Sequence, residues 1–417
     1  MLNGKVIGAG FGGTKGCIRA IERGIIKKEN AMIVNSTLKD IPMAYDEISA
    51  CYSRAYGGSA QERSAAKELS LDALQNDDVF IQKIDGFVDP TTEVVVFVVS
   101  SEGGTGSGSV PVLAKYFNTV IRRAFPKLKI HIFDITGFED SGRGMQNTIE
   151  FFQELDPSYT VQAISLKKYI DDGMTRSQAE DAADEEFASK LSIVLGRNIN
   201  YEDSRHNMDE SDLLKVTTTP GFMRTWRVPF TKLKNIDAFN TLLSDTIDND
   251  KSLDIPKQSI ARLGIITHID ITKHEEMIDY GFPIVKNKLG NYFEIFTHDN
   301  KYIDGQEEYV EFIASGLKMP IDELKSIYAK YQKETASIQT SKDDFFDVMN
   351  GLRGDIATDK MFTVGANKKN LDIPEKVDLK KDDFFGSFVA KEEPAIKEAV
   401  VTEDDNDVFK KDITKNF

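Results

Sequence analysis

The segment Ser101–Ser109, which reads SEGGTGSGS, decides how this chain folds. It follows the apolar run Val94–Val99, which predicts a buried parallel strand, and it precedes Val110–Val120, which predicts a helix. Glycines let backbone N–H groups approach an anion closely, and the start of a helix adds partial positive charge. The segment therefore predicts a phosphate-binding site, although it lacks the lysine of a Walker P-loop.

Length and composition set the broad class of the protein. The 417 residues suggest two folded domains with appendages, and the 40% hydrophobic content is enough for real cores. A net charge of −16 disfavours direct binding to nucleic acid. The apolar runs are too short to span a membrane, Met1–Lys5 leads straight into a strand without a signal peptide, and Cys17 and Cys51 fit a reducing compartment. We therefore expect a cytoplasmic protein.

Strand and helix patterns alternate along the first half of the chain. Strands are predicted at Lys5–Ile7, Ala31–Asn35, Val94–Val99, Ile130–Ile135 and Val161–Leu166, with helical patterns between them. This alternation predicts an α/β fold in which helices cover both faces of a parallel sheet.

Two further glycine loops follow the same logic. Gly8–Gly13, GAGFGG, matches the dinucleotide-binding pattern, but Asn35–Thr37 follows the second strand, where an acidic residue would hold the ribose of NAD. Tyr56–Ser59, YGGS, precedes another helix. The glycines could serve only tight turns; however, the carboxyl ends of parallel strands meet at one edge, which favours a shared phosphate site over separate turns.

The second half adds a long helix, an acidic loop and a tail. A helix is predicted over Ser177–Leu195, and Asn207–Asp212, NMDESD, either caps the next helix or supplies a carboxylate pair that orients water. From Pro220 we expect a second domain with strands at 224–228, 264–271, 281–285 and 292–297, and then a helix from Pro320 to about Ile338. Beyond Gly354 the composition indicates a tail, where KDDFF at 381–385 repeats 342–346, by coincidence or as a docking motif.

These loops together resemble the tubulin and FtsZ superfamily. Gly103–Gly108 is similar to the GGGTGSG signature, with Glu102 where the family usually has glycine or alanine. Val6–Gly13 resembles the first phosphate loop, Tyr56–Ala60 the γ-phosphate loop, and Asn207–Asp212 the NxDxxD catalytic loop. Order and spacing agree over roughly residues 1–355, and TubZ, the tubulins of plasmids and phages, is the most similar subgroup.

The resemblance implies a tubulin/FtsZ-like α/β fold. We expect a Rossmann-type, parallel-sheet GTP-binding domain over 1–175, a central helix and catalytic loop over 176–219, and a smaller α/β activation domain over 220–318. A C-terminal helical region over 319–355 and a charged flexible tail over 356–417 complete the prediction.

The resemblance also implies the site residues and the cofactors, which are GTP or GDP with Mg²⁺. Catalysis is expected from Asp209 and Asp212 with Asn207, and no side chain is assigned to a metal. Ser165 stands where the family has a guanine-reading Asn, and Asp184 can accept from the guanine N1 and N2 donors. The expected nucleotide contacts are Gly10, Phe11, Gly12, Gly13, Asn35, Gly57, Gly58, Gly103, Gly104, Thr105, Gly106, Ser107, Gly108, Glu139, Arg143, Ser165 and Asp184.

The central helix sets the expected mechanism. At about 1.5 Å per residue it extends on the order of 30 Å, so Asp209 and Asp212 are expected to act on the nucleotide of the next subunit in an open head-to-tail filament. A DNA segregation role implies a DNA-binding adaptor, docked on the tail, rather than direct contact with nucleic acid. The alternatives are an FtsZ-like division filament, an NAD-dependent Rossmann enzyme and a noncatalytic tubulin-like scaffold.

Overall fold

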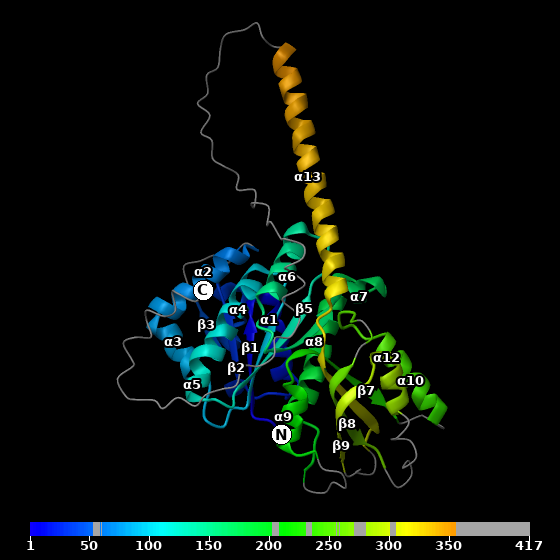
Figure 1. Cartoon of the computed structure of the whole chain (residues 1–417). Coiled ribbons are helices and arrows are strands. Elements are labelled where there is room, and N and C mark those ends of the chain that lie inside the picture. Colours follow the sequence, from blue (N-terminus) through cyan, green and yellow to red (C-terminus); the bar gives the residue numbers. More distant parts are fainter. Residues whose placement is uncertain are drawn as a thin grey trace.

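A single sheet of ten strands runs through the whole folded body of this computed structural model, in the order β3-β2-β1-β4-β5-β6-β7-β10-β8-β9 (Figure 1). The structure describes residues 1–52, 59, 61–201, 208–230, 236–255, 257, 259–270, 281–300 and 306–355, with only the backbone from 339 onward. The strands are β1 (Gly4–Ala9), β2 (Ala31–Asn35), β3 (Ser49–Cys51), β4 (Val94–Val99), β5 (Lys129–Thr136), β6 (Thr160–Ser165), β7 (Gly221–Pro229), β8 (Ile260–His268), β9 (Tyr292–Asp299) and β10 (Tyr309–Leu317).

The first six strands in space pair in parallel, as the alternating pattern predicted. Every residue of β1, β2, β4 and β6 is buried, because helices cover both faces of a parallel sheet. The helices of this half are α1 (Gly10–Glu22), α2 (Arg63–Asn76), α3 (Asp78–Asp85), α4 (Gly104–Tyr116), α5 (Arg122–Ala124), α6 (Gly142–Glu154), α7 (Leu166–Asp171) and α8 (Arg176–Val194).

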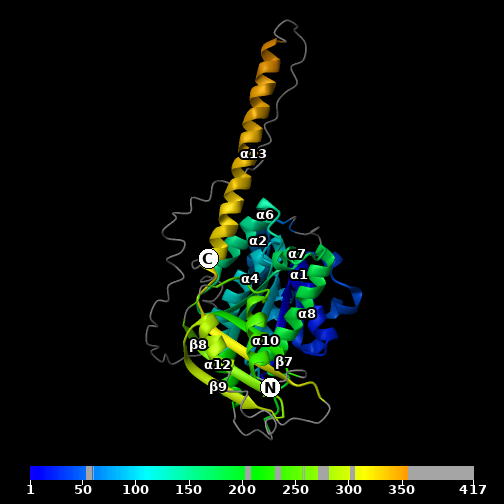
Figure 2. The ribbon, with the colours of Figure 1, turned by 90° about the vertical axis from the view of Figure 1, so that its right-hand side faces the viewer.

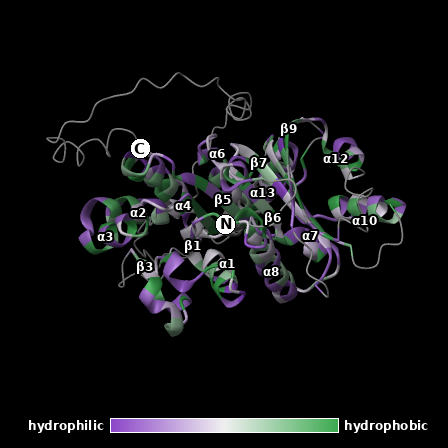
Figure 3. Ribbon diagram, turned by 90° about the horizontal axis from the view of Figure 1, so that it is seen from below, coloured by the Kyte–Doolittle hydropathy of each residue, from purple (hydrophilic) through white to green (hydrophobic). Residues whose placement is uncertain are grey.

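Alternate side chains along the strands point to opposite faces of the sheet and pack into two separate hydrophobic cores. Phe97 on β4 lies in the core beneath α2, α4 and α6, whereas Val96 and Val98 lie in the core beneath α1 and α8. Seen from below, α1 and α8 lie on one side of the sheet and α4 and α6 on the other (Figure 3). Phe187 of α8 packs edge-on against Phe133 of β5, with ring centroids 4.7 Å apart.

The second half continues the same sheet. Strand β7 pairs in parallel with β6 at Thr160–Gly221 and Val161–Phe222, then antiparallel with β10, which in turn pairs antiparallel with β8. Helices α9 (Glu210–Thr217), α10 (Ile236–Asp248) and α12 (Gly281–Leu289) cover this part. The predicted boundary near residue 220 falls where β7 begins, and the sheet crosses it without a break.

The strand predicted at 281–285 is wrong, because this segment forms helix α12. Its buried residues Gly281, Val285 and Leu289 recur every four positions and lie on one helical face. A short apolar run does not by itself distinguish a strand from a buried helix. Strand β10 was not predicted at all, although it lies in the centre of the second half of the sheet.

The C-terminal helix α13 (Ile321–Asp355) continues past the predicted helix end near Ile338 and spans almost all of the predicted helical region 319–355. Its first turns lie against α6, and the rest extends away from the folded body (Figures 1 and 2). In the part of the chain that the structure describes, no helix is both long enough and apolar enough to cross a membrane.

Replacing Phe187 tests the core under the central helix. We expect Phe187→Ala to lower the free energy of unfolding by about 3–5 kcal/mol, because the ring is fully buried and leaves a cavity. Phe293→Ala on β9 is the matched control, since that ring is 88% exposed and its loss should change stability by less than about 0.5 kcal/mol. Urea unfolding measures both, and equal effects would contradict this account of the core.

Candidate functional site

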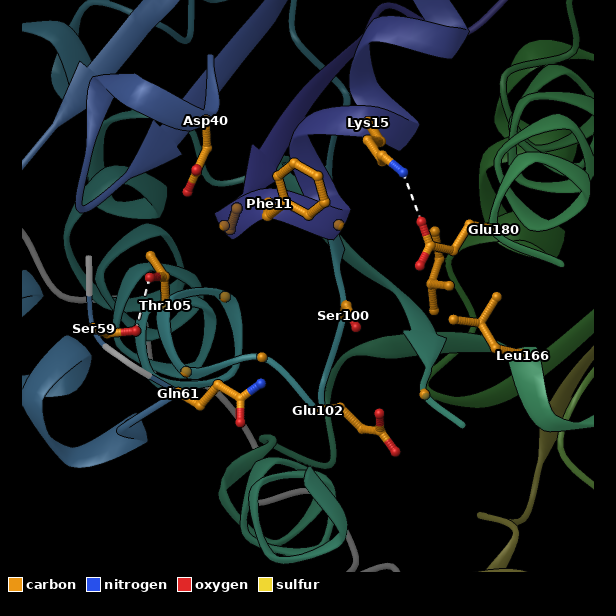
Figure 4. A pocket seen from close by; sticks show the side chains of 18 of the residues that line it. Phe11, Lys15, Asp40, Ser59, Gln61, Ser100, Glu102, Thr105, Leu166 and Glu180 are labelled. Atoms are coloured by element: carbon orange, nitrogen blue, oxygen red, sulfur yellow. Dashed lines mark hydrogen bonds and ion pairs between the residues drawn. The ribbon is translucent and has the colours of Figure 1, made fainter. Parts of the chain in front are cut away.

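A cavity of about 350 Å³ opens at the carboxyl ends of β1, β4 and β5 (Figure 4). This volume lies at the lower end of the range for small-molecule sites, and the sheet edge is where ligands bind in open α/β folds. The cavity is lined by Ala9, Gly10, Phe11, Gly12, Lys15, Asp40, Ser59, Gln61, Ser100, Glu102, Gly103, Gly104, Thr105, Gly106, Ile135, Gly137, Phe138, Leu166, Glu180 and Asp184.

Two helices begin at this cavity. Helix α1 starts at Gly10 and α4 at Gly104, so the glycines expected to form a loop before the second helix are its first turns. Gly10 has a φ of +69°, and a Cβ on it would lie 2.7 Å from the Gly106 nitrogen. Only glycine allows the two helix starts to come this close. Their free N–H groups converge on one space, which suits a polyanion.

The Thr105 hydroxyl joins three segments at the cavity wall. It lies 2.9 Å from the Ser36 hydroxyl, which follows β2, and 3.0 Å from the Ser59 hydroxyl (Figure 4). These segments are separated by 69 and 46 residues from Thr105 in the chain. The hydroxyl cluster therefore fixes the N-terminus of α4 relative to the neighbouring loops.

Asp134 anchors the loop from the sheet side. Its buried carboxylate accepts hydrogen bonds from the Ser101 N–H at 2.8 Å and from the Ser101 and Thr136 hydroxyls at 2.9 Å each. Burial raises the pKa of Asp134 to about 7 despite these donors. The glycine segment is thus held at its base before the helix begins.

Three charged side chains of the cavity come from α1 and α8. Lys15 Nζ lies 2.7 Å from a Glu180 carboxylate oxygen, an ion pair that joins α1 to α8, and it also lies over the Phe11 ring at 5.1 Å (Figure 4). Asp184, one turn further along α8, is buried, and burial raises its pKa to about 7. A ligand that offers hydrogen-bond donors to Asp184 would stabilise its ionised form.

About half of the predicted nucleotide contacts line the cavity. These are Gly10, Phe11, Gly12, Gly103, Gly104, Thr105, Gly106 and Asp184. Gly13, Asn35, Ser107 and Gly108 lie behind the wall, where Ser107 donates to its own helix backbone and the Asn35 oxygen accepts from the Ser36 N–H at 2.8 Å. Gly57, Gly58 and Asn207 lie outside the described residues.

The structure places Glu139 and Ser165 in a different cleft. Both line a space of about 470 Å³ at the foot of α13, where the Glu139 carboxylate pairs with Lys330. Arg143 lies near Glu62 at 3.9 Å and does not line the cavity. The loop after β5 instead contributes Gly137 and Phe138 to the cavity wall.

Asp209 and Asp212 meet at the start of α9. Asp209 is the N-cap, and its carboxylate accepts from the Asp212 N–H at 2.8 Å, so the capping interpretation is confirmed. The neighbouring Glu210 pairs with the Met1 ammonium at 2.7 Å, which places this turn at the amino end of β1. The cavity is at the carboxyl end of the same strand, and neither Asp209 nor Asp212 lines it.

Several lining residues were missed by sequence reasoning. Lys15 and Glu180 lie one turn beyond residues that were predicted, so helical spacing from Gly12 and Asp184 could have found them. Asp40 ends a short 3-10 helix and Leu166 begins α7, and neither lies beside a glycine-rich segment, whereas Gln61 follows the glycine-bearing loop at 56–60. Only the tertiary arrangement brings them to the cavity.

The pKa of Asp184 predicts a pH-dependent stability. An unfolded aspartate has a pKa of about 3.9, so between pH 5 and 7 the folded protein holds a proton that the unfolded chain has lost. This stabilisation is complete below about pH 4 and is lost as the pH rises through 7. We expect the free energy of unfolding of the wild type, relative to Asp184→Asn, to fall by about 2 kcal/mol between pH 5 and 8.

Urea unfolding without nucleotide at the two pH values measures this difference. Asp181→Asn is the control on the same helix, because its side chain is 66% exposed. If the difference in the free energy of unfolding between the wild type and Asp184→Asn is the same at both pH values, the raised pKa of Asp184 is wrong.

Comparison with known proteins finds relatives by structure alone. No family model matches the chain, and no curated protein matches it by sequence. The GTPγS-form protofilament of Bacillus thuringiensis serovar israelensis TubZ aligns with a TM-score of 0.60 and 14% identity, covering 82% of this chain and 94% of that one. Tail-truncated TubZ of Clostridium botulinum phage c-st aligns with a TM-score of 0.59 and 15% identity, covering 80% of this chain and 97% of that one.

A third neighbour is a CetZ protein. GDP-bound, monomeric CetZ1 of Haloferax volcanii aligns with a TM-score of 0.59 and 18% identity, covering 80% of this chain and 100% of that one. At these identities the likeness concerns the fold, and it extends over nearly the whole of each neighbour. The chain therefore has the fold of the tubulin/FtsZ superfamily and resembles TubZ within it.

Proposed function

We propose that this protein binds and hydrolyses GTP and assembles head to tail into filaments. The observation that carries the proposal is the cavity formed by two helix N-termini, with the acidic pair Asp209 and Asp212 at the opposite edge of the same sheet. A solved neighbour with the same fold is a GTPγS-form protofilament, and another is bound to GDP.

The phosphates of the nucleotide fit the helix starts. Among the described residues that line the cavity, Lys15 is the one cationic side chain, and it is already paired with Glu180. Charge on the phosphates must then be met by backbone N–H groups, by the Ser59 and Thr105 hydroxyls and by a metal ion. This arrangement replaces the lysine of a P-loop with main-chain donors.

Mg²⁺ is compatible with the residues present. Bound to a nucleotide, Mg²⁺ takes most of its ligands from phosphate and water and needs only one or two carboxylates. Asp40 lines the same cavity as Thr105 and Ser59 (Figure 4) and is the carboxylate we assign to this role. When bound, the ion would offset charge on the phosphates.

The base belongs on the α8 side of the cavity. The Asp184 carboxylate can accept from the paired N1 and N2 donors of guanine, whereas adenine does not offer two adjacent donors there. Leu166 and Phe11 supply apolar surface in the same cavity. Guanine is therefore the proposed base, with Asp184 as the residue that selects it.

Hydrolysis requires a second subunit in this proposal. Asp209 and Asp212 lie at the amino end of β1 and the nucleotide at its carboxyl end, so a carboxylate reaches a γ-phosphate only across a head-to-tail contact. Such a heterologous contact does not close and builds a filament. Asp212, half-buried, and Asp209 would orient the attacking water, with Asn207 completing the loop.

Assembly and turnover test the proposal together. Right-angle light scattering is expected to rise with GTP and Mg²⁺ but not with ATP or GDP. Asp209→Ala and Asp212→Ala should lower phosphate release by about 100-fold or more, because water is no longer oriented, while pelleted filaments persist. Phosphate release and sedimentation measure the two effects.

Glu210→Ala is the matched control in the same turn. Its carboxylate is 57% exposed and pairs with the N-terminus, so turnover should stay at the wild-type rate. Wild-type turnover in either aspartate variant would overturn the catalytic assignment of that residue. If light scattering of the wild type does not rise with GTP, the proposal of a filament is wrong.

We further propose that the filament segregates DNA through a DNA-binding adaptor docked on the tail. The net charge of −16 argues against direct binding to DNA, whereas Lys410, Lys411 and Lys415 with Phe409 and Phe417 form a basic, aromatic chain end. The tail lies outside the described residues. A division filament of the FtsZ kind shares the same chemistry and differs in its partner.

Removing residues 370–417 tests the tail. We expect GTP turnover to stay unchanged and binding of a labelled DNA-binding partner, measured by fluorescence polarisation, to be lost, because the docking residues are gone. A full-length variant carrying Lys410→Glu and Lys411→Glu should weaken the same binding. Unchanged affinity after the deletion would remove the adaptor from the proposal.

A further inference from the structure

Glu102 directly precedes the glycine-rich residues Gly103–Gly108, and its carboxylate faces the turn after β5 (Figure 4). One carboxylate oxygen accepts from the Glu139 backbone N–H at 2.7 Å. A Cβ on Gly137 would lie only 1.7 Å from the Glu102 carboxyl carbon, so the side chain fills the space that glycine leaves there. The acid is thus fitted to this turn and not turned toward solvent.

The backbone of Glu102 is fixed as well. Its carbonyl accepts from the buried Asn147 side chain of α6 at 3.0 Å, and Asn147 also donates to the Gln61 carbonyl at 3.0 Å. Glu102, Gln61, Gly137 and Phe138 all line the nucleotide cavity. The wall formed by the turn after β5 is therefore set by where Glu102 holds it.

Glu139 is held from the other side by the C-terminal helix. Its side chain, 4% exposed, pairs with Lys330 of α13 and lines the second cleft. Its backbone has a φ of +57°, a conformation that costs a residue with a side chain on the order of 1 kcal/mol or more and persists where surrounding contacts impose it. The contacts that impose it here come from Glu102 and from Lys330.

We infer that Glu102 is a positioning residue of the nucleotide site, and that Glu102, Glu139 and Lys330 couple the wall of the nucleotide cavity to helix α13. A ligand that presses on Phe138 or Gly137 acts on a turn whose next residue is tied to α13. Coupling between sites is reciprocal for binding free energies, so if nucleotide binding shifts the contact between Glu139 and Lys330, breaking that contact changes nucleotide affinity. The inference rests on the proposed function, because the ligand of the cavity is taken to be GTP or GDP.

The far end of this connection gives the sharpest test. Lys330 lies outside the nucleotide cavity and its side chain is 42% exposed, so Lys330→Met keeps the length of the side chain and removes the ion pair. We expect the variant to bind GDP about fivefold more weakly than the wild type, measured by titration with a fluorescent GDP analogue. Lys333→Met, an exposed lysine on the same helix, should leave the affinity unchanged.

Variants at Glu102 test the near end. Glu102→Ala removes the acceptor and should weaken GDP binding, whereas Glu102→Gln keeps an oxygen that can accept from the Glu139 N–H and should restore most of the affinity. If the two ends act through one residue, Glu102→Ala combined with Lys330→Met will weaken binding by less than the product of the separate effects. Urea unfolding of each variant separates this from a general loss of stability.

The outcomes separate this inference from the proposed function. If the wild type does not bind guanine nucleotide, the proposed function fails. If the wild type binds and Lys330→Met has wild-type affinity, or if the effects of the two substitutions multiply, the coupling is wrong while the function stands. Failure of Glu102→Ala to fold leaves Lys330→Met as the deciding variant.

Discussion

The close approach of two helix starts is the constraint on which this structure depends. Gly10 and Gly106 bring the first turns of α1 and α4 together at one edge of the sheet, with the Gly10 backbone in a left-handed conformation. Each helix leaves unpaired N–H groups at its start, and two such starts facing one space repel each other unless an anion lies between them. The glycine pair therefore makes a packing contact and leaves a space whose partial positive charge suits an anion.

Much of the surrounding structure holds this contact in place. The Thr105 hydroxyl meets Ser36 and Ser59, and buried Asp134 holds Ser101 at the base of the loop. On the opposite face, α8 carries Glu180 to Lys15 on α1 and Asp184 to the cavity. In the proposed nucleotide complex, main-chain donors and hydroxyls face the phosphates, and the central helix α8 faces the base.

The acidic turn and the cavity lie at opposite ends of the parallel strands. Asp209 and Asp212 begin α9 at the amino end of β1, tied there by the ion pair between Glu210 and the N-terminus. Within one folded chain, the cavity and the acidic turn lie at opposite ends of β1 and are therefore separated by the length of the strands. The proposed reaction needs both, so one of them has to come from another molecule, and this is the physical reason for proposing that turnover depends on assembly.

The sequence alone determined the parallel half of the sheet and the glycine-led starts of α1 and α4, because buried strands and glycine-rich helix starts have strong local patterns. It also placed Asp184 within the long helix and Asp209 at the start of the next one, since helical periodicity and capping are local signals. Tertiary structure decided the rest. The segment 281–285 became a helix because its apolar residues meet the sheet every four positions, and β10 was inserted between β7 and β8 by long-range pairing that no local pattern records. Glu139 and Ser165 line the second cleft, and Glu102 accepts a hydrogen bond from the Glu139 backbone. Neither could be predicted, because these contacts depend on how turns that are distant in the sequence pack together.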